Sequence, residues 1–192
     1  MTATEILGAE HRVIEQVLNV LEIMAARAAQ TGQLNAADAT ATVAFFRTFA
    51  DQCHHGKEEA QLFPLLEARG FPRNGGPTGV MLAEHEFGRA RVRAMEAAAR
   101  QGDAREFATH AEQFITMLRQ HIQKEDHCLF SMANQALTAA DQADLLTAFD
   151  RVETEHLGAG THEKFLKLAD DLAGQYGVAK AATPAASHGC HH

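Results

Sequence analysis

Two segments of the chain carry a histidine followed four residues later by a glutamate. The first reads HHGKEEAQLF from His54, and the second reads HIQKEDHCLF from His121. They share the pattern H-x-x-K-E-[ED]-x-x-L-F without a gap, which aligns Glu58 with Glu125. Residues four apart lie on one face of a helix, so each segment presents an imidazole and a carboxylate together. Mixed imidazole and carboxylate donors suit iron, manganese or zinc.

The first segment also contains a second pair in the adjacent register, His55 with Glu59. The counterparts of this pair in the other segment are Ile122 and Asp126. Isoleucine has no donor atom for a metal, so the register shared by both segments is preferred. His55 and Glu59 lie about 100° around the helix and are interpreted as supporting groups or surface residues. A site built on them is the alternative.

Two further histidines sit on apolar faces and are themselves part of a repeat. His11 lies in LGAEHRVI and His85 in MLAEHEFG, so the chain repeats a helical hairpin. A lone histidine on such a face is more often a buried hydrogen-bonded group than a ligand. Two buried carboxylates at one level, however, are costly without compensating charge, and a pair of cations removes that cost. The predicted ligand set is His11, His54, Glu58, His85, His121 and Glu125.

Helical periodicity and capping signals divide the chain into six helices. They are expected over residues 3–29, 35 or 38 to 69, 78–101, 104–135, 139–157 and 161–175, with Pro64 shortening or kinking the second. The predicted fold is all-α, an up-down-up-down four-helix bundle with C-terminal helices packed outside it. One domain is expected over residues 1–176, with the core bundle at about 3–136 and the C-terminal helices at about 138–176. The remainder, 177–192, reads as a disordered tail.

Composition narrows the classes of partner. The chain has 192 residues, a formal net charge of −8 and three unclustered cysteines. An acidic protein is poorly suited to nucleic acid or an anionic membrane. No stretch offers the roughly 20 apolar residues of a membrane span, and the N-terminal residues lack the apolar core of a secretion signal. We therefore expect a cytoplasmic protein, with Cys53 and Cys128 acting as small buried apolar groups.

Several other polar residues have two readings each. Glu10 and Glu84 precede His11 and His85 in both hairpins, and either orient imidazoles from behind or face solvent. His156 and His162 flank a Gly-Ala-Gly break. Packing or capping is favoured for these two over a role as a seventh ligand or a gate. The terminal letters HGCHH could bind a soft metal, but a disordered end is favoured.

These motifs resemble those of the hemerythrin-like (HHE cation-binding) family, over residues 1 to about 135. The resemblance implies a four-helix bundle that holds two non-haem iron ions with bridging carboxylates and a bridging oxo or hydroxo group, with the six predicted residues as ligands. Oxygen-carrying members have a second histidine on the third helix, where this sequence has Arg89. The set of four histidines and two glutamates is instead similar to that of bacterial proteins that repair iron centres.

The predicted function is therefore a non-haem di-iron protein that binds or senses O₂, NO or related reactive species such as peroxide. Two alternatives stay open. One is an iron donor in the repair of iron centres under nitrosative or oxidative stress, and the other is a di-iron NO or peroxide reductase. A ferritin-like site is rejected because it needs two Glu-x-x-His motifs, and a zinc protease is rejected because HExxH is absent.

Overall fold

The computed structural model describes residues 1–156 and 158–181, and the side chains of Glu155 and His156 are outside that description. Every element in the described part is helical. In chain order they are α1 (Ala3–Thr31), α2 (Ala36–Phe45), the π-helices η1 (Phe46–His55) and η2 (Glu58–Leu62), α3 (Phe63–Ala68), α4 (Pro77–Gln101), α5 (Ala104–Lys124), the π-helix η3 (Glu125–Leu129), α6 (Phe130–Ala136), α7 (Ala139–Arg151), the π-helix η4 (Val152–His156) and α8 (Thr161–Tyr176).

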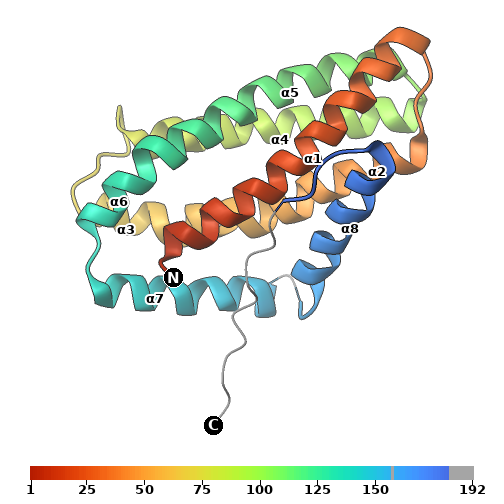
Figure 1. Cartoon of the computed structure of the whole chain (residues 1–192). Coiled ribbons are helices and arrows are strands. Elements are labelled where there is room, and N and C mark those ends of the chain that lie inside the picture. Colours follow the sequence, from red (N-terminus) through yellow and green to blue (C-terminus); the bar gives the residue numbers. More distant parts are fainter. Residues whose placement is uncertain (157, 182–192) are drawn as a thin grey trace.

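These elements build the predicted bundle with extra C-terminal helices, which is confirmed. The four arms are α1, the continuous run from α2 to α3, α4, and the run from α5 to α6 (Figure 1). Helix α5 packs against both α1 and α4. Helix α7 lies along one side of the bundle against α1 and η2, and α8 packs against α1 and α2. The C-terminal helices therefore cover the first hairpin.

Three helices start where their capping residues predict. Thr2 and Thr138 each form a capping box, with Glu5 and Asp141 respectively. Asp103 caps α5 through the backbone N–H of Glu106. A helix whose first N–H groups are bonded in this way starts at a defined residue. These caps fix the register of three helices.

Two apolar clusters fill the bundle, and a polar band separates them. The larger cluster includes Ile14, Val92 and Leu118, and the smaller one includes Leu7 and Met81. Along three arms the predicted ligands fall between the two clusters in the sequence, and on the fourth Glu125 does so, while His121 directly precedes Ile122 at the edge of the larger cluster. Buried polar groups within an apolar core need partners, so this band is where function is expected.

The two arms that carry a histidine and a glutamate four residues apart both become π-helical at that glutamate. The π-helix η2 begins at Glu58 and η3 begins at Glu125, and each is five residues long. Pro64 follows η2 in the first turn of α3, and the N–H of Phe63 bonds back five residues to Glu58. Proline is not required for this geometry, because η3 has none. Single π-turns of this kind occur often at functional sites.

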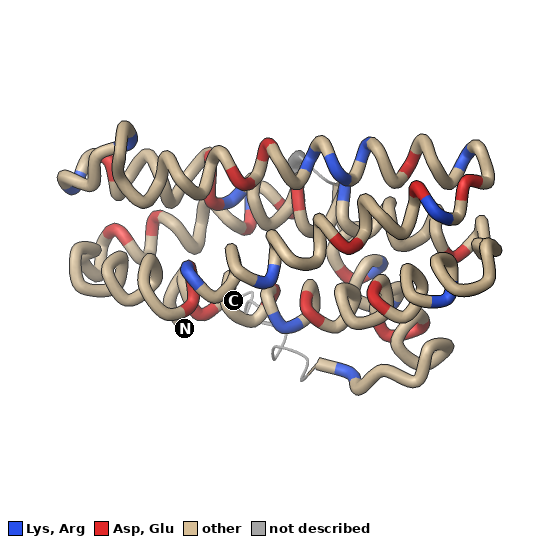
Figure 2. The backbone as a smooth tube through the Cα atoms, turned by 90° about the horizontal axis from the view of Figure 1, so that it is seen from above, with Lys and Arg blue, Asp and Glu red and all other residues tan. Residues whose placement is uncertain are grey.

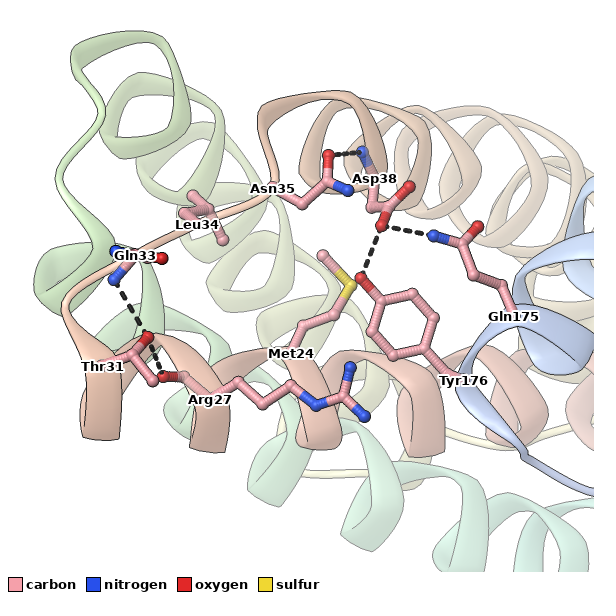
Figure 3. A pocket seen from close by; sticks show the side chains of 9 residues that line it. All are labelled: Met24, Arg27, Thr31, Gln33, Leu34, Asn35, Asp38, Gln175 and Tyr176. Carbon is pink, nitrogen blue, oxygen red and sulfur yellow. Dashed lines mark hydrogen bonds between the residues drawn. The ribbon is translucent and has the colours of Figure 1, made fainter.

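The C-terminal end of α8 packs against the bundle where α1 ends and α2 begins. There, a cavity of about 700 Å³ lies where the end of α1, the start of α2 and the end of α8 meet (Figure 3). Asp38 accepts hydrogen bonds from the Tyr176 hydroxyl at 2.6 Å and from Gln175 at 2.7 Å. The Arg27 guanidinium lies 5.2 Å from the centre of the Tyr176 ring. These contacts hold the C-terminal helix in place.

Charged residues of both signs are interspersed along the helices (Figure 2). After α8 the chain continues without helix to Ala181, whose N–H donates to Gln16. The rest of the expected tail, 182–192, lies outside the described residues. In the part of the chain that the structure describes, none of the helices combines the length and apolarity of a membrane span.

Candidate metal centre

The structure brings all six predicted ligands into one buried band. They come from all four arms, and none is more than 1% exposed: His11, His54, Glu58, His85, His121 and Glu125. The hairpin repeat explains this arrangement, because each hairpin supplies two histidines and one glutamate at matching heights. Full burial of two carboxylates without a cation is unfavourable.

Each glutamate lies between imidazoles of the two hairpins. Glu125 Oε2 is 3.2 Å from His11 Nε2 and 3.2 Å from His121 Nε2. Glu58 Oε1 is 3.5 Å from His54 Nε2, and its Oε2 is 3.5 Å from His85 Nε2. A carboxylate placed in this way can contact two cations at once.

The ligand atoms fall into two groups of four that share Glu58. One group is His11, His54, Glu58 and Glu125, and the other is His55, Glu58, His85 and His121. Within each group the four donor atoms lie within 4.8 Å of one another. Two neighbouring cation positions joined by a shared carboxylate fit this arrangement.

The donor atoms themselves lack other partners. Among the described residues, the Nε2 atoms of His11, His54 and His55 and both carboxylate oxygens of Glu58 and Glu125 are buried without a hydrogen bond. Buried polar atoms are nearly always satisfied, and leaving so many unpaired in one place would be costly. Metal coordination would satisfy all of them, so the residues present fit a metal pair.

The pair His85 and His121 also needs a positive centre. Their Nδ1 atoms lie 2.6 Å from a Glu59 oxygen and 2.9 Å from a Glu84 oxygen, respectively. A carboxylate only accepts, so each Nδ1 donates and each Nε2 faces the interior. The two Nε2 atoms are 3.2 Å apart. Two lone pairs do not face each other at that distance, so one Nε2 carries a proton in the metal-free site, and a bound cation would take its place.

The carboxylates that precede the first histidine of each hairpin orient the second histidine. Glu10 accepts from His54 Nδ1 at 2.9 Å and from the Lys57 ammonium. The repeat reproduces this contact in the other hairpin, where Glu84 accepts hydrogen bonds from the Lys124 ammonium and from His121 Nδ1. Of the two readings for Glu10 and Glu84, the structure supports orientation of the imidazoles.

The last acidic residue of the motif works across the hairpins. Asp126 lies 2.7 Å from His11 Nδ1 and also accepts a hydrogen bond from the Arg12 guanidinium. Glu59 accepts from His85 and from Arg89, the latter at 2.7 Å. Each charged residue of K-E-[ED] therefore has its own role. The lysine neutralises a supporting carboxylate, the first acid points into the band, and the second acid orients a histidine.

Burial leaves several imidazoles neutral. It lowers the pKa of His54 and of His55 to about 4 and that of His85 to about 3. Burial acts to lower the pKa of His121 as well, but the Glu125 and Glu84 carboxylates together raise it to about 9. Neutral imidazoles bind metals, so three histidines are ready to coordinate near neutral pH.

The two glutamates have opposite protonation tendencies. Burial and the charge of Glu125 raise the pKa of Glu58 well above its usual range. Burial also acts to raise the pKa of Glu125, but His121 and His11 overcome it and hold the pKa well below the usual value. Without a cation the pair would hold a proton at Glu58.

His55 is the residue that sequence reasoning placed outside the ligand set. In the structure it is 6% exposed and belongs to the second group of donor atoms. It closes the wide-turned π-helix η1, which brings both His54 and His55 to the interior. One sequence signal was available, because an acidic residue, Asp51, precedes His55 by four residues. In the structure its Oδ1 lies 3.4 Å from His55 Nδ1.

A third acidic group lies behind the band and has its own cation. Glu10, Glu153 and His162 converge there, but the buried ammonium of Lys57 already contacts both glutamates. His162 stacks on Phe49 with 5.2 Å between ring centres. Packing, the favoured reading of His162, matches this geometry. The side chain of His156 lies outside the described residues.

Cys128 differs from expectation. It is exposed, whereas Cys53 is buried as predicted. The helical periodicity that placed Cys128 inward assumes 3.6 residues per turn, and that period does not hold in η3, where Cys128 lies.

Comparison with known proteins agrees with the geometry. The family model described as Hemerythrin HHE cation binding domain matches residues 2–133. The uncharacterized protein Rv1995 of Mycobacterium tuberculosis is 26% identical over 184 residues, which cover 93% of this chain and 71% of that protein. The uncharacterized protein Mb2018 of Mycobacterium bovis is equally similar, at 26% identity over the same shares. No solved structure gives a significant match. The match over most of the chain and the buried cluster of histidines and glutamates show that this chain belongs to the hemerythrin HHE cation-binding family.

Proposed function

We propose that the chain is a non-haem di-iron protein that binds or senses O₂, NO or a related reactive species. The observation that carries this proposal is the pair of donor groups that share Glu58. Imidazole and carboxylate donors in one site suit iron. Four protein donors for each iron leave coordination positions free, and iron held there would supply reversible electron exchange with a small ligand.

The surroundings of the site favour a ligand of a few atoms. The donors are at most 6% exposed, and apolar clusters lie on both sides of the band. Four carboxylates around the band contact the Nδ1 atoms of the imidazoles and hold the rings in fixed orientations: Glu10, Glu59, Glu84 and Asp126. A preorganised site of this kind binds without rebuilding its donor set.

Metal content tests the first half of the proposal. Protein loaded anaerobically with Fe(II) should hold about two irons per chain, one for each donor group. Glu58→Ala and Glu125→Ala should each remove most of that iron. Glu112→Ala, at an exposed position on the same arm as Glu125, is the matched control and should retain it. Full occupancy by zinc without iron uptake would overturn the proposal.

Reactivity tests the second half. The reduced protein is mixed separately with O₂, NO and peroxide and followed by stopped-flow absorbance. A stable, reversible spectral change supports binding or sensing. Oxidation with turnover would assign the reductase alternative, and transfer of iron to an apo-protein acceptor without a spectral change would assign the donor alternative.

A further inference from the structure

A cavity lies beside the candidate metal centre, where α4 and α5 of the second hairpin face η1. It has a volume of about 270 Å³, lies between η1, α4 and α5, and includes His55 in its wall. Apolar side chains form much of the lining: Phe46, Ala50, Val92, Phe114, Met117 and Leu118. Apolar walls with a few polar groups are typical of sites for organic ligands.

Two departures from the repeat coincide at this cavity. Alignment of MLAEHEFG with LGAEHRVI places Gly88 where the first hairpin has Ile14, which is buried in the core. A Cβ at Gly88 would lie 3.1 Å from Met117 Cε and 3.5 Å from Phe114 Cε2. Met117 and Phe114 therefore approach the backbone of Gly88 closely, and Gly88 itself forms part of the cavity wall. The second departure is His55, whose counterpart is Ile122. A glycine and a residue with a donor atom therefore replace two isoleucines in the wall of this cavity.

The rim of the cavity carries an unused positive charge. Arg47 pairs with Glu96 at 3.2 Å, and Arg89 with Asp51 at 2.8 Å. Arg93 is exposed and has no ion pair or hydrogen bond with any residue in the described ranges. A guanidinium with free N–H groups can bind a carboxylate through two parallel hydrogen bonds.

We propose that this cavity binds an organic monocarboxylate with an apolar body. The carboxylate would meet Arg93 at the rim, and the apolar end would point toward His55. An apolar cavity of about 150 Å³ holds a benzene molecule, so this volume accommodates about ten non-hydrogen atoms. A short fatty acid or an arylalkanoic acid has this size and polarity. The site lies beside the metal centre of the proposed function, but its occupation does not depend on which metal is bound.

Calorimetric titration of the purified protein, with its metal content measured, tests the proposal. The probes are octanoate, 3-phenylpropionate and the neutral 3-phenylpropanamide. Both acids should bind at one site per chain with Kd below about 1 mM, and the amide at least about tenfold more weakly. Equal binding of acid and amide, or no acid binding up to about 5 mM, would overturn the proposal.

Two variants assign the binding to the cavity. Gly88→Ile, which restores the residue of the other hairpin, should abolish binding of both acids. Arg93→Gln should weaken acid binding about tenfold and leave the amide unchanged. The matched controls are Gly174→Ile, a helical glycine with open space around it, and Arg105→Gln, an exposed arginine on α5. Wild-type acid binding by either cavity variant contradicts the proposal.

Ala50→Leu provides a second way to fill the cavity if Gly88→Ile does not fold, as judged by circular dichroism. It should also abolish acid binding, and retained binding in the folded variant contradicts the proposal. Failure of the di-iron proposal can be told apart from failure of the cavity proposal. Protein that takes up no iron but binds the acids would reject the first and support the second.

Discussion

The His55 ring stacks on the His85 ring, with 3.8 Å between the ring centres and 12° between the planes. Both side chains belong to the same group of donor atoms. Because the repeat has isoleucine at the position equivalent to His55, the two groups of donor atoms are not equivalent as candidate cation positions. One position has a third imidazole, and the other has a second carboxylate.

Replacing His55 by phenylalanine should weaken one metal position and spare the other. His55→Phe keeps a ring to stack on His85 but removes the donor Nε2. Loss of a direct ligand should exceed the roughly 10–100-fold cost of losing a group that orients a ligand. Competition with a chelator should therefore give one tight and one weakened metal. His127→Phe, at an exposed histidine, is the control, and two metals of unchanged affinity in His55→Phe would reject His55 as a ligand.

Adjacent glutamates should respond differently to the same change. Glu58→Gln removes the charge of the shared carboxylate and should abolish binding of the metal pair. Glu59→Gln affects only the orientation of His85 and the pairing of Arg89, and should lower affinity about 10–100-fold. Metal titration monitored by absorbance measures both. A larger loss in Glu59→Gln than in Glu58→Gln would show that the other register carries the ligands.

Most of this arrangement follows from local sequence. The repeated motif aligned His54 with His121 and so selected Glu58 over Glu59 as the inward carboxylate. Helix starts followed from capping pairs such as Thr138 with Asp141, because a cap involves residues only three apart. A predicted start at Thr78 was less accurate: α4 begins at Pro77, where proline fits the first helical turn.

The features that escaped prediction depend on geometry that sequence periodicity does not encode. The π-turns place His55 in the interior and Cys128 at the surface, because a uniform helical period of 3.6 residues per turn does not hold there. The pairing of the buried Lys57 with the half-buried Glu153 joins residues 96 apart, and nothing local signals it. The cavity beside Gly88 likewise depends on side chains of other helices, such as Met117 and Phe46.

Metal uptake should release protons. Without metal, the pKa of His121 is raised to about 9 and that of Glu58 is raised well above its usual range. His121 therefore holds a proton at neutral pH, Glu58 keeps its proton to a higher pH than an ordinary carboxyl group, and a metal must displace these protons. Raised pKa values mean that competition weakens as pH increases, so apparent affinity should rise from about pH 6 to about pH 8. Calorimetry in buffers of different ionisation enthalpy measures the release, and equal heats in all buffers would contradict this account.

The described cysteines should differ sharply in reactivity. Cys53 is 1% exposed, and burial together with the charge of Glu10 raises the pKa of its thiol to about 12. Cys128 is exposed. Iodoacetamide reacts with thiolates, so native protein should be labelled at Cys128 and spared at Cys53, as read by peptide mass spectrometry.

The rate of Cys53 labelling should also report on the metal centre. Cys53 directly precedes His54 on η1, so its thiol becomes accessible only when that arm opens. A metal that binds the closed arm lowers the open population in proportion to its binding. Loaded protein should therefore label at Cys53 at least about tenfold more slowly than metal-free protein, while Cys128 serves as the internal control. Equal Cys53 rates with and without metal would show that His54 does not hold the ion.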